Sequence, residues 1–148
     1  MVFRSKIDAY FVKFISIILV ILGIAVLFPL FVDDKLSFVE ISALLSILIV
    51  VIAFILWPIF TTKYVFKQQH LVVKGGFFRS RIPYEEITRV NQTTDIFTGY
   101  RILTSKDAIE IFYQSGVFGS VKISPADKQL FITELKKRCP RATIRLEK

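Results

Sequence analysis

Three basic residues surround a pair of glycines in the segment 74–81, which reads KGGFFRSR. Lys74, Arg79 and Arg81 carry the charges that bind anions, and a guanidinium group binds phosphate oxygens through two parallel hydrogen bonds. In a strand, Arg79 and Arg81 lie two residues apart and therefore point to the same face. Three interpretations stay open: a phosphate clamp for a lipid headgroup, a surface for a protein partner, and a solvated outer face of a hairpin. The solvated face is the simplest of the three.

The other residues whose side chains could react or bind a metal form no recognisable catalytic or metal site. His70 is the single histidine and has no second ligand at a metal-binding spacing. Glu85 and Glu86 are adjacent, so their side chains diverge and do not form an acid–base pair. Cys139 is the single cysteine and cannot form a disulfide within the chain. The sequence therefore predicts no metal, no cofactor and no enzymatic activity.

Two long apolar segments precede these residues. Residues 14–32 and 41–62 contain no charged side chain, and each segment is long enough as a helix to cross about 30 Å of hydrocarbon. The first segment continues through Phe-Pro-Leu-Phe and is soon followed by the second. A cleaved signal peptide would have a shorter apolar core and small residues at a cleavage site. We expect a transmembrane helical hairpin in residues 1–60 and a separate folded domain in residues 61–148.

The distribution of charge predicts the orientation of this hairpin. Basic residues flank its two ends (Arg4, Lys6, Lys13, Lys63 and Lys67), whereas the loop 33–40 contains only Lys35. The positive-inside bias then places both termini in the cytoplasm, in a multi-pass protein of the cell membrane. Residues 1–60 carry four basic and four acidic side chains, so the net charge of +8 resides in residues 61–148. Because almost no linker follows the second span, the basic domain must lie against the membrane, where each nearby Lys or Arg contributes about 1 kcal/mol with anionic lipid.

The pattern after residue 61 changes to short strands. Apolar residues alternate at Tyr64 and Phe66 and again at Leu71 and Val73, and Gly75-Gly76 predicts a hairpin turn with a positive φ angle. The expected strands after Tyr64 are 71–74, 78–82, 87–92, 100–104, 108–113 and 117–123.

One amphipathic helix should follow the strands. Ser124 fits an N-cap, Pro125 fits the first helical position, and Asp127 suits the positive end of the first turn. Leu130, Phe131 and Leu135 supply an apolar stripe, and Pro140 stops the helix. Strands followed by one helix predict an α+β domain, with a strongly bent antiparallel sheet and the helix at one open end.

Several short motifs together resemble the bacterial PH-like domains of the YyaB-like family. These are the hairpin pattern Leu71, Val73, Gly75, Phe77, Ile82-Pro83 and Ile87, the segment 105–111 (SKDAIEI), and Ile123-Ser124-Pro125 with Phe131 and Leu135. The resemblance covers about residues 61–140, and Ser-Lys-Ile-Asp at 5–8 is similar to the family's N-terminal segments. It implies a PH-like split barrel capped by a helix, and it implies no catalytic residues.

These features together predict a small membrane protein that displays a PH-like domain at the cytoplasmic surface. The domain would bind a protein partner or lipid headgroups, with Lys74, Arg79 and Arg81 as the candidate contact residues. The alternative is an accessory subunit whose hairpin packs into a larger membrane complex. A membrane-tethered sheet without a basic aromatic motif argues against nucleic-acid binding. The sequence leaves the oligomeric state open.

Overall fold

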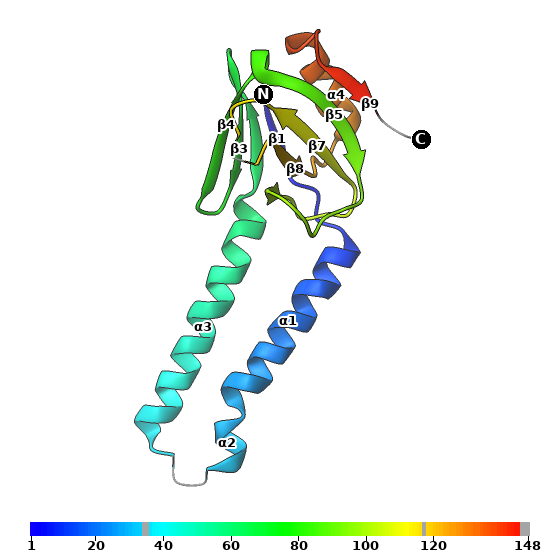
Figure 1. Cartoon of the computed structure of the whole chain (residues 1–148). Coiled ribbons are helices and arrows are strands. Elements are labelled where there is room, and N and C mark those ends of the chain that lie inside the picture. The colour runs from blue at the N-terminus through cyan, green and yellow to red at the C-terminus, as the bar shows by residue number, and fades with distance from the viewer. Residues whose placement is uncertain (34–35, 117, 146–148) are drawn as a thin grey trace.

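The computed structural model describes residues 1–33, 36–116 and 118–145. Two long helices lie side by side and lead into a β-rich domain at one end (Figure 1). The expected loop residues Asp34 and Lys35, and the expected strand residue Val117, lie outside the described residues.

The helical part comprises α1 (Ala9–Leu27), the short α2 (Pro29–Val32) and α3 (Phe38–Thr61). Asp8 caps α1 by accepting a hydrogen bond from the Phe11 amide at 2.8 Å, so this helix begins five residues before the expected span. Pro29 has no amide hydrogen and begins α2 directly after the first helix ends. Ser37 and Glu40 form a capping box on α3. Both long helices are long and apolar enough to cross a membrane, and neither contains a residue buried by the protein itself.

The first sheet joins strands from both sides of the helical hairpin. Its antiparallel order is β1-β2-β3-β4, with bounds Val2–Arg4, Lys63–Phe66, His70–Gly75 and Phe78–Pro83. The predicted hairpin is present, and Gly76 adopts the positive φ angle, at 56°. The strand β1 lies within the residues 1–60 that the sequence assigned to the membrane hairpin. A division of the chain at residue 61 therefore separates two strands that pair with each other.

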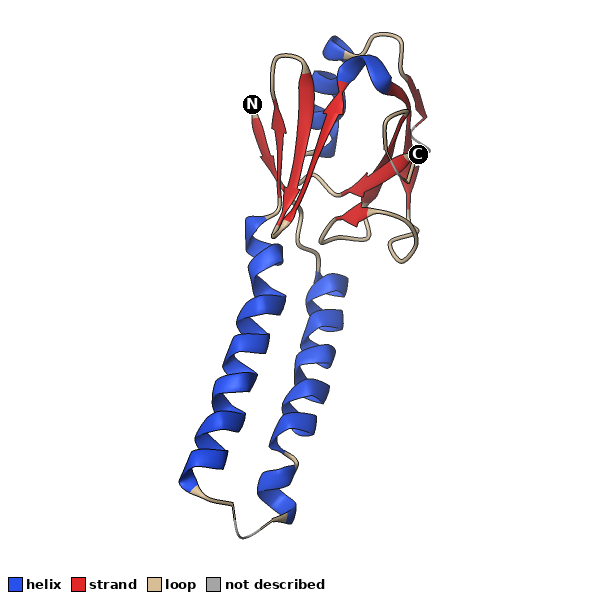
Figure 2. Cartoon of the chain, turned by 60° about the vertical axis from the view of Figure 1, so that its left-hand side comes forward, coloured by secondary structure: helices blue, strands red, loops and turns tan. Residues whose placement is uncertain are grey.

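The second sheet has the order β6-β8-β7-β5-β9. Its strands are β5 (Ile87–Thr93), β6 (Arg101–Ile102), β7 (Ala108–Tyr113), β8 (Ser120–Ile123) and β9 (Thr143–Arg145). A 3-10 helix, η1 (Tyr84–Glu86), connects the two sheets. The pairs β5/β9 and β6/β8 are parallel, in contrast to the expected antiparallel sheet. Both sheets lie at the same end of the long helices and do not close into one barrel (Figure 2).

The helix α4 (Lys128–Arg138) packs on the sheets and completes the core. Phe131 is fully buried and lies in edge contact with Phe3 at 5.2 Å between ring centroids. The expected N-cap Ser124 was wrong: Asp127 caps the helix by accepting from the Leu130 amide at 2.9 Å. Ser124 is instead buried among polar groups, and Pro125 forms a β-bridge with Ser5.

Candidate anion-binding surface

Four basic residues form one row across the first sheet. The strand register pairs Arg4 with Lys63, Lys63 with Lys74, and Lys74 with Arg79. Directly paired residues of an antiparallel sheet project to the same face. We call these four residues the basic row. All four side chains are exposed.

The opposite face of the same strands forms part of the core. Phe3, Tyr64 and Val73 lie next to members of the basic row in sequence, and all three are buried. This alternation explains why the charges collect on the outer face. Arg81 pairs with Val72 on that outer face, one row further from the helices. The structure therefore brings together the predicted residues Lys74, Arg79 and Arg81, and it adds Arg4 and Lys63.

The basic row has no acidic partner among the residues that the structure describes. Within the described part of the chain, no carboxylate lies at ion-pair distance from its four members or from Arg81. Three acidic residues of the domain form ion pairs with other cations: Asp95 pairs with Lys122, Asp107 with Lys6 and Lys128, and Glu134 with Arg138 and Lys137. No described carboxylate therefore offsets the positive charge of this outer face.

The row lies where the domain meets the helices. The helix α3 ends at Thr61, two residues before Lys63, and the Gly76 amide donates to Thr61 Oγ1 at 3.1 Å. Phe77, at the turn between β3 and β4, contacts Trp57 of α3 at 5.5 Å between ring centroids. If α3 crosses a bilayer, the row stands at the level of the lipid headgroups.

A second aromatic contact supports the domain beside the other helix. Phe97, in the loop before β6, contacts Phe14 of α1 at 6.1 Å between ring centroids. Thr98 and Lys122 donate hydrogen bonds to Asp95 in that loop, and they lower the pKa of its carboxyl group. The nearly buried ammonium of Lys122 thereby ties the loop to β8.

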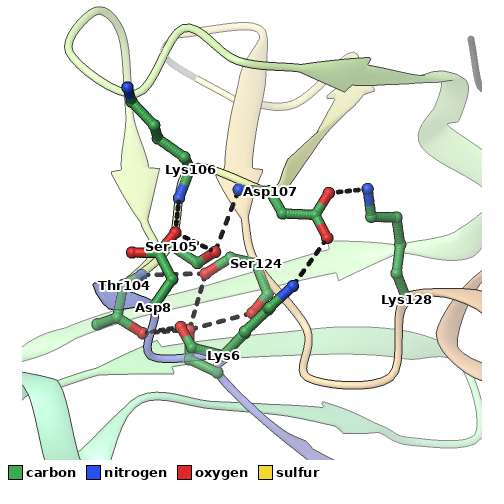
Figure 3. Close-up of polar contacts among 9 residues, drawn as sticks. Lys6, Asp8, Thr104, Ser105, Lys106, Asp107, Ser124 and Lys128 are labelled. Carbon is green, nitrogen blue, oxygen red and sulfur yellow. Dashed lines mark hydrogen bonds and ion pairs between the residues drawn. The ribbon is translucent and has the colours of Figure 1, made fainter. Parts of the chain in front are cut away.

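A network of polar groups fastens the start of α1 to the domain (Figure 3). Ser5 Oγ lies 3.0 Å from Ser124 Oγ and 2.8 Å from Thr104 Oγ1. The Asp8 carboxylate accepts from Ser105 Oγ at 2.8 Å and from the Lys106 amide at 2.7 Å. Partial burial opposes the charge of Asp8, but its hydrogen bonds to the Phe11 and Lys106 amides and to Ser105 outweigh that effect and lower its pKa.

Three segments that carry the resemblance meet in this network: residues 5–8, 105–107 and 123–125. Ser5 Oγ also lies 2.9 Å from the hydroxyl of Tyr64, which is fully buried and donates to the Ile102 carbonyl at 2.8 Å. Each of the three motifs is visible in the sequence, but local patterns do not predict that they meet. Their shared role is to hold the segment before α1 on the domain.

The remaining candidates do not assemble a reactive site. His70 pairs with Pro83 across the β3–β4 hairpin. The Glu86 carboxylate accepts a hydrogen bond from the Ser115 amide at 3.1 Å rather than contacting Glu85. The described residues include no group of three potential metal ligands. Cys139 is buried, and burial raises the pKa of its thiol to about 11, which keeps it protonated at neutral pH.

The comparisons with known proteins agree with this fold. The family model described as "Bacterial PH domain" matches residues 62–139. The curated relative "Uncharacterized protein YyaB" of Bacillus subtilis (strain 168) is 40% identical over 84 residues, which cover 57% of each chain. The match thus spans a little over half the length of that relative. No solved structure matches the chain. With more than half of its length matched by the family model, and with two sheets and a C-terminal helix in place, the chain belongs to the bacterial PH domain family.

Proposed function

We propose that the protein crosses the membrane twice and holds its PH-like domain against the cytoplasmic leaflet, where the outer face of the first sheet binds anionic lipid headgroups. The observation that carries this proposal is the basic row, four cations beside the end of α3 with no carboxylate partner in the described part of the chain. The role is one of binding and positioning rather than catalysis.

The two long helices support a membrane-spanning arrangement. Their 19 and 24 residues correspond to about 28 and 36 Å of helix: α3 exceeds a hydrocarbon core of roughly 30 Å, and α1 comes close to it and is continued by α2. Because β1 precedes α1 and β2 follows α3, their pairing keeps both ends of the hairpin on one side. The basic residues at those ends favour the cytoplasmic side.

The positive charge on the outer face supports anionic lipid, rather than neutral lipid, as the target. A Lys or Arg close to an anionic leaflet contributes about 1 kcal/mol, and this attraction weakens beyond a Debye length of about 8 Å at physiological salt. The basic row is fixed close to the helix end, so its members would remain within that distance. The domain would therefore keep one face against the leaflet.

A charge-matched pair of variants tests this proposal. The full chain should be used, because the fragment 61–148 lacks β1. The purified protein in neutral detergent is titrated with phosphatidylglycerol or phosphatidylcholine, and bound lipids are counted by native mass spectrometry. We expect a preference for phosphatidylglycerol that K74A/R79A/R81A reduces about tenfold, corresponding to about 1.4 kcal/mol. The control K136A/K137A/R141A removes the same charge from exposed positions on and after α4 and should keep the preference.

Equal binding of the two lipids by the unmodified protein, or equal loss in both variants, would refute headgroup binding by this face.

The accessory-subunit alternative makes a different prediction. It requires one stoichiometric membrane protein to co-purify with the chain after mild detergent extraction, and that association should survive the loss of the three basic residues.

A further inference from the structure

A cavity of about 450 Å³ lies between the outer face of the first sheet and the last turns of α3. Its lining includes Arg4, Lys63 and Lys74 from three adjacent strands, and Trp57 and Phe60 from the helix. This volume is within the range of small-ligand sites. The cavity includes three members of the basic row, whereas Arg79 and Arg81 do not line it.

The cavity has two chemically different sides. The strands supply three cations, and α3 supplies an indole and a phenyl ring, both more than half exposed. The aromatic side continues along the apolar surface of α3, which has no buried residue. A ligand that fills both sides must carry an anionic group joined to a hydrocarbon chain. A phospholipid has this composition.

The polar groups around the cations are already satisfied within the protein. Thr61 Oγ1 donates to the Trp57 carbonyl at 2.8 Å, and Thr62 Oγ1 donates to the Pro58 carbonyl at 2.6 Å. The Gly76 amide is held by Thr61. A Cβ atom at Gly76 would come within 3.0 Å of Pro58, so the hairpin turn packs closely against the helix. The walls are therefore fixed, and the three cations are left to bind the ligand.

The spacing of the cations indicates the charge of the headgroup. Directly paired side chains of an antiparallel sheet have Cβ atoms about 4.5–5.5 Å apart, and like charges at this spacing are destabilising. Lys63 stands between two such neighbours, Arg4 and Lys74. A headgroup with one charge would leave two of the three cations uncompensated. A phosphate monoester carries nearly two negative charges near neutral pH and offers three acceptor oxygens.

We propose that this cavity binds one phospholipid with a phosphomonoester headgroup, of the phosphatidic acid type, with its phosphate on Arg4, Lys63 and Lys74 and an acyl chain along Trp57 and Phe60. This inference rests on the proposed function and narrows it. The sheet face as a whole would attract anionic lipid, whereas the cavity would select one molecule by its double charge.

The single tryptophan of the chain provides the measurement, because Trp57 lines the cavity. Full-chain protein in neutral detergent is titrated with phosphatidic acid brominated on its acyl chain, which quenches an indole in contact with it. Brominated phosphatidylglycerol and brominated phosphatidylcholine are compared. We expect phosphatidic acid to quench at about tenfold lower concentration than phosphatidylglycerol, and native mass spectrometry to count one tightly held molecule per chain.

Two variants of equal charge separate this inference from the broader proposal. K63Q/K74Q should remove the advantage of phosphatidic acid over phosphatidylglycerol. R79Q/R81Q should keep it, although the general preference for anionic lipid declines. Retention of the advantage by K63Q/K74Q, or its loss in both variants with unchanged unfolding temperatures, would overturn the cavity assignment. A preference for phosphatidylglycerol over phosphatidylcholine without any advantage for phosphatidic acid would overturn the cavity alone and leave the proposed function standing.

A soluble phosphate is the other source of the same chemistry. Glycerol 3-phosphate carries the monoester without acyl chains, so we expect it to displace brominated phosphatidic acid only at concentrations at least about a hundredfold higher. Displacement at equal concentration would show that the acyl chain contributes nothing, and it would refute the lipid as the ligand.

Discussion

At the scale of single residues, Asp8 performs two tasks. Its Oδ1 atom caps α1 through the Phe11 amide, and its Oδ2 atom accepts from Ser105 and from the Lys106 amide. Lys106 also places its ammonium 3.8 Å from the centroid of the Tyr10 ring on α1. The carboxylate therefore fixes the direction in which α1 leaves the domain.

Replacement of Asp8 by Ala should lower the unfolding free energy by about 1–2 kcal/mol, since the cap and its partners are lost together. The folded protein lowers the pKa of Asp8 below its ordinary value of 3.8. The stability that the ionised Asp8 carboxylate contributes is therefore fully present above pH 3.8. It is lost as the pH falls through the lower pKa that Asp8 has in the folded state.

Thermal unfolding of the full chain in detergent, measured between pH 7 and pH 3, checks this prediction. The difference between the unmodified protein and D8A should shrink toward the acidic end. D8N is the control, because asparagine caps a helix as well as aspartate but carries no charge. A difference that stays constant or grows on acidification would contradict the assigned role.

At the scale of elements, β1 is one of two strands, with β9, that the sequence patterns do not predict. It has three residues and directly precedes the loop into α1, so no alternation is long enough to reveal it. Its middle residue, Phe3, is 6% exposed and lies in edge contact with Phe66 and Phe131. The strand therefore supplies part of the core as well as one residue of the basic row.

Replacement of Phe3 by Ala should destabilise the domain by about 3–5 kcal/mol, because a buried ring leaves a cavity in the core. The neighbouring Val2 is 60% exposed, so V2A should change the unfolding free energy by less than about 0.5 kcal/mol. Denaturant unfolding of both full-chain variants, followed by near-UV circular dichroism, tests the difference. Similar effects of the two substitutions would show that β1 contributes little to the core.

Local patterns predicted the elements better than their assembly. Gly75-Gly76 indicated the β3–β4 hairpin because the turn chemistry is contained in adjacent residues. The partnership of Lys63 with Arg4 depends on strands separated by the whole helical hairpin, and no local rule reports that register. Ser124 looked like a cap by its position before a proline, but tertiary hydrogen bonds to Ser5 and Thr104 occupy it.

At the scale of the whole molecule, the domain is held at three places beside the helices. These are the polar network at Asp8, the contact of Phe77 with α3, and the contact of Phe97 with α1. The two helices therefore leave the domain in one defined orientation, and in the proposed arrangement the domain presents one surface toward the leaflet. In that arrangement, the side of the membrane on which this surface lies would decide which lipids it meets.

The expected topology places the domain in the cytoplasm, since the basic residues gather at the domain end of the hairpin. A C-terminal epitope tag on the full chain should resist protease added to intact cells and should be digested after the cells are permeabilised. An extracellular protein of known exposure serves as the positive control. Digestion of the tag in intact cells would place the domain outside and contradict the topology.

The pairing of β1 with β2 also imposes an order on synthesis. The N-terminal strand emerges from the ribosome first, but its partner is made only after α1, the connecting loop and α3. In the proposed topology, Phe3 cannot reach Phe66 and Phe131 until the second helix has entered the bilayer and returned the chain to the side where it began. Under that topology, a nascent chain that inserted only one helix would leave the two strands on opposite sides of the bilayer, so completion of this sheet would require correct insertion of the hairpin.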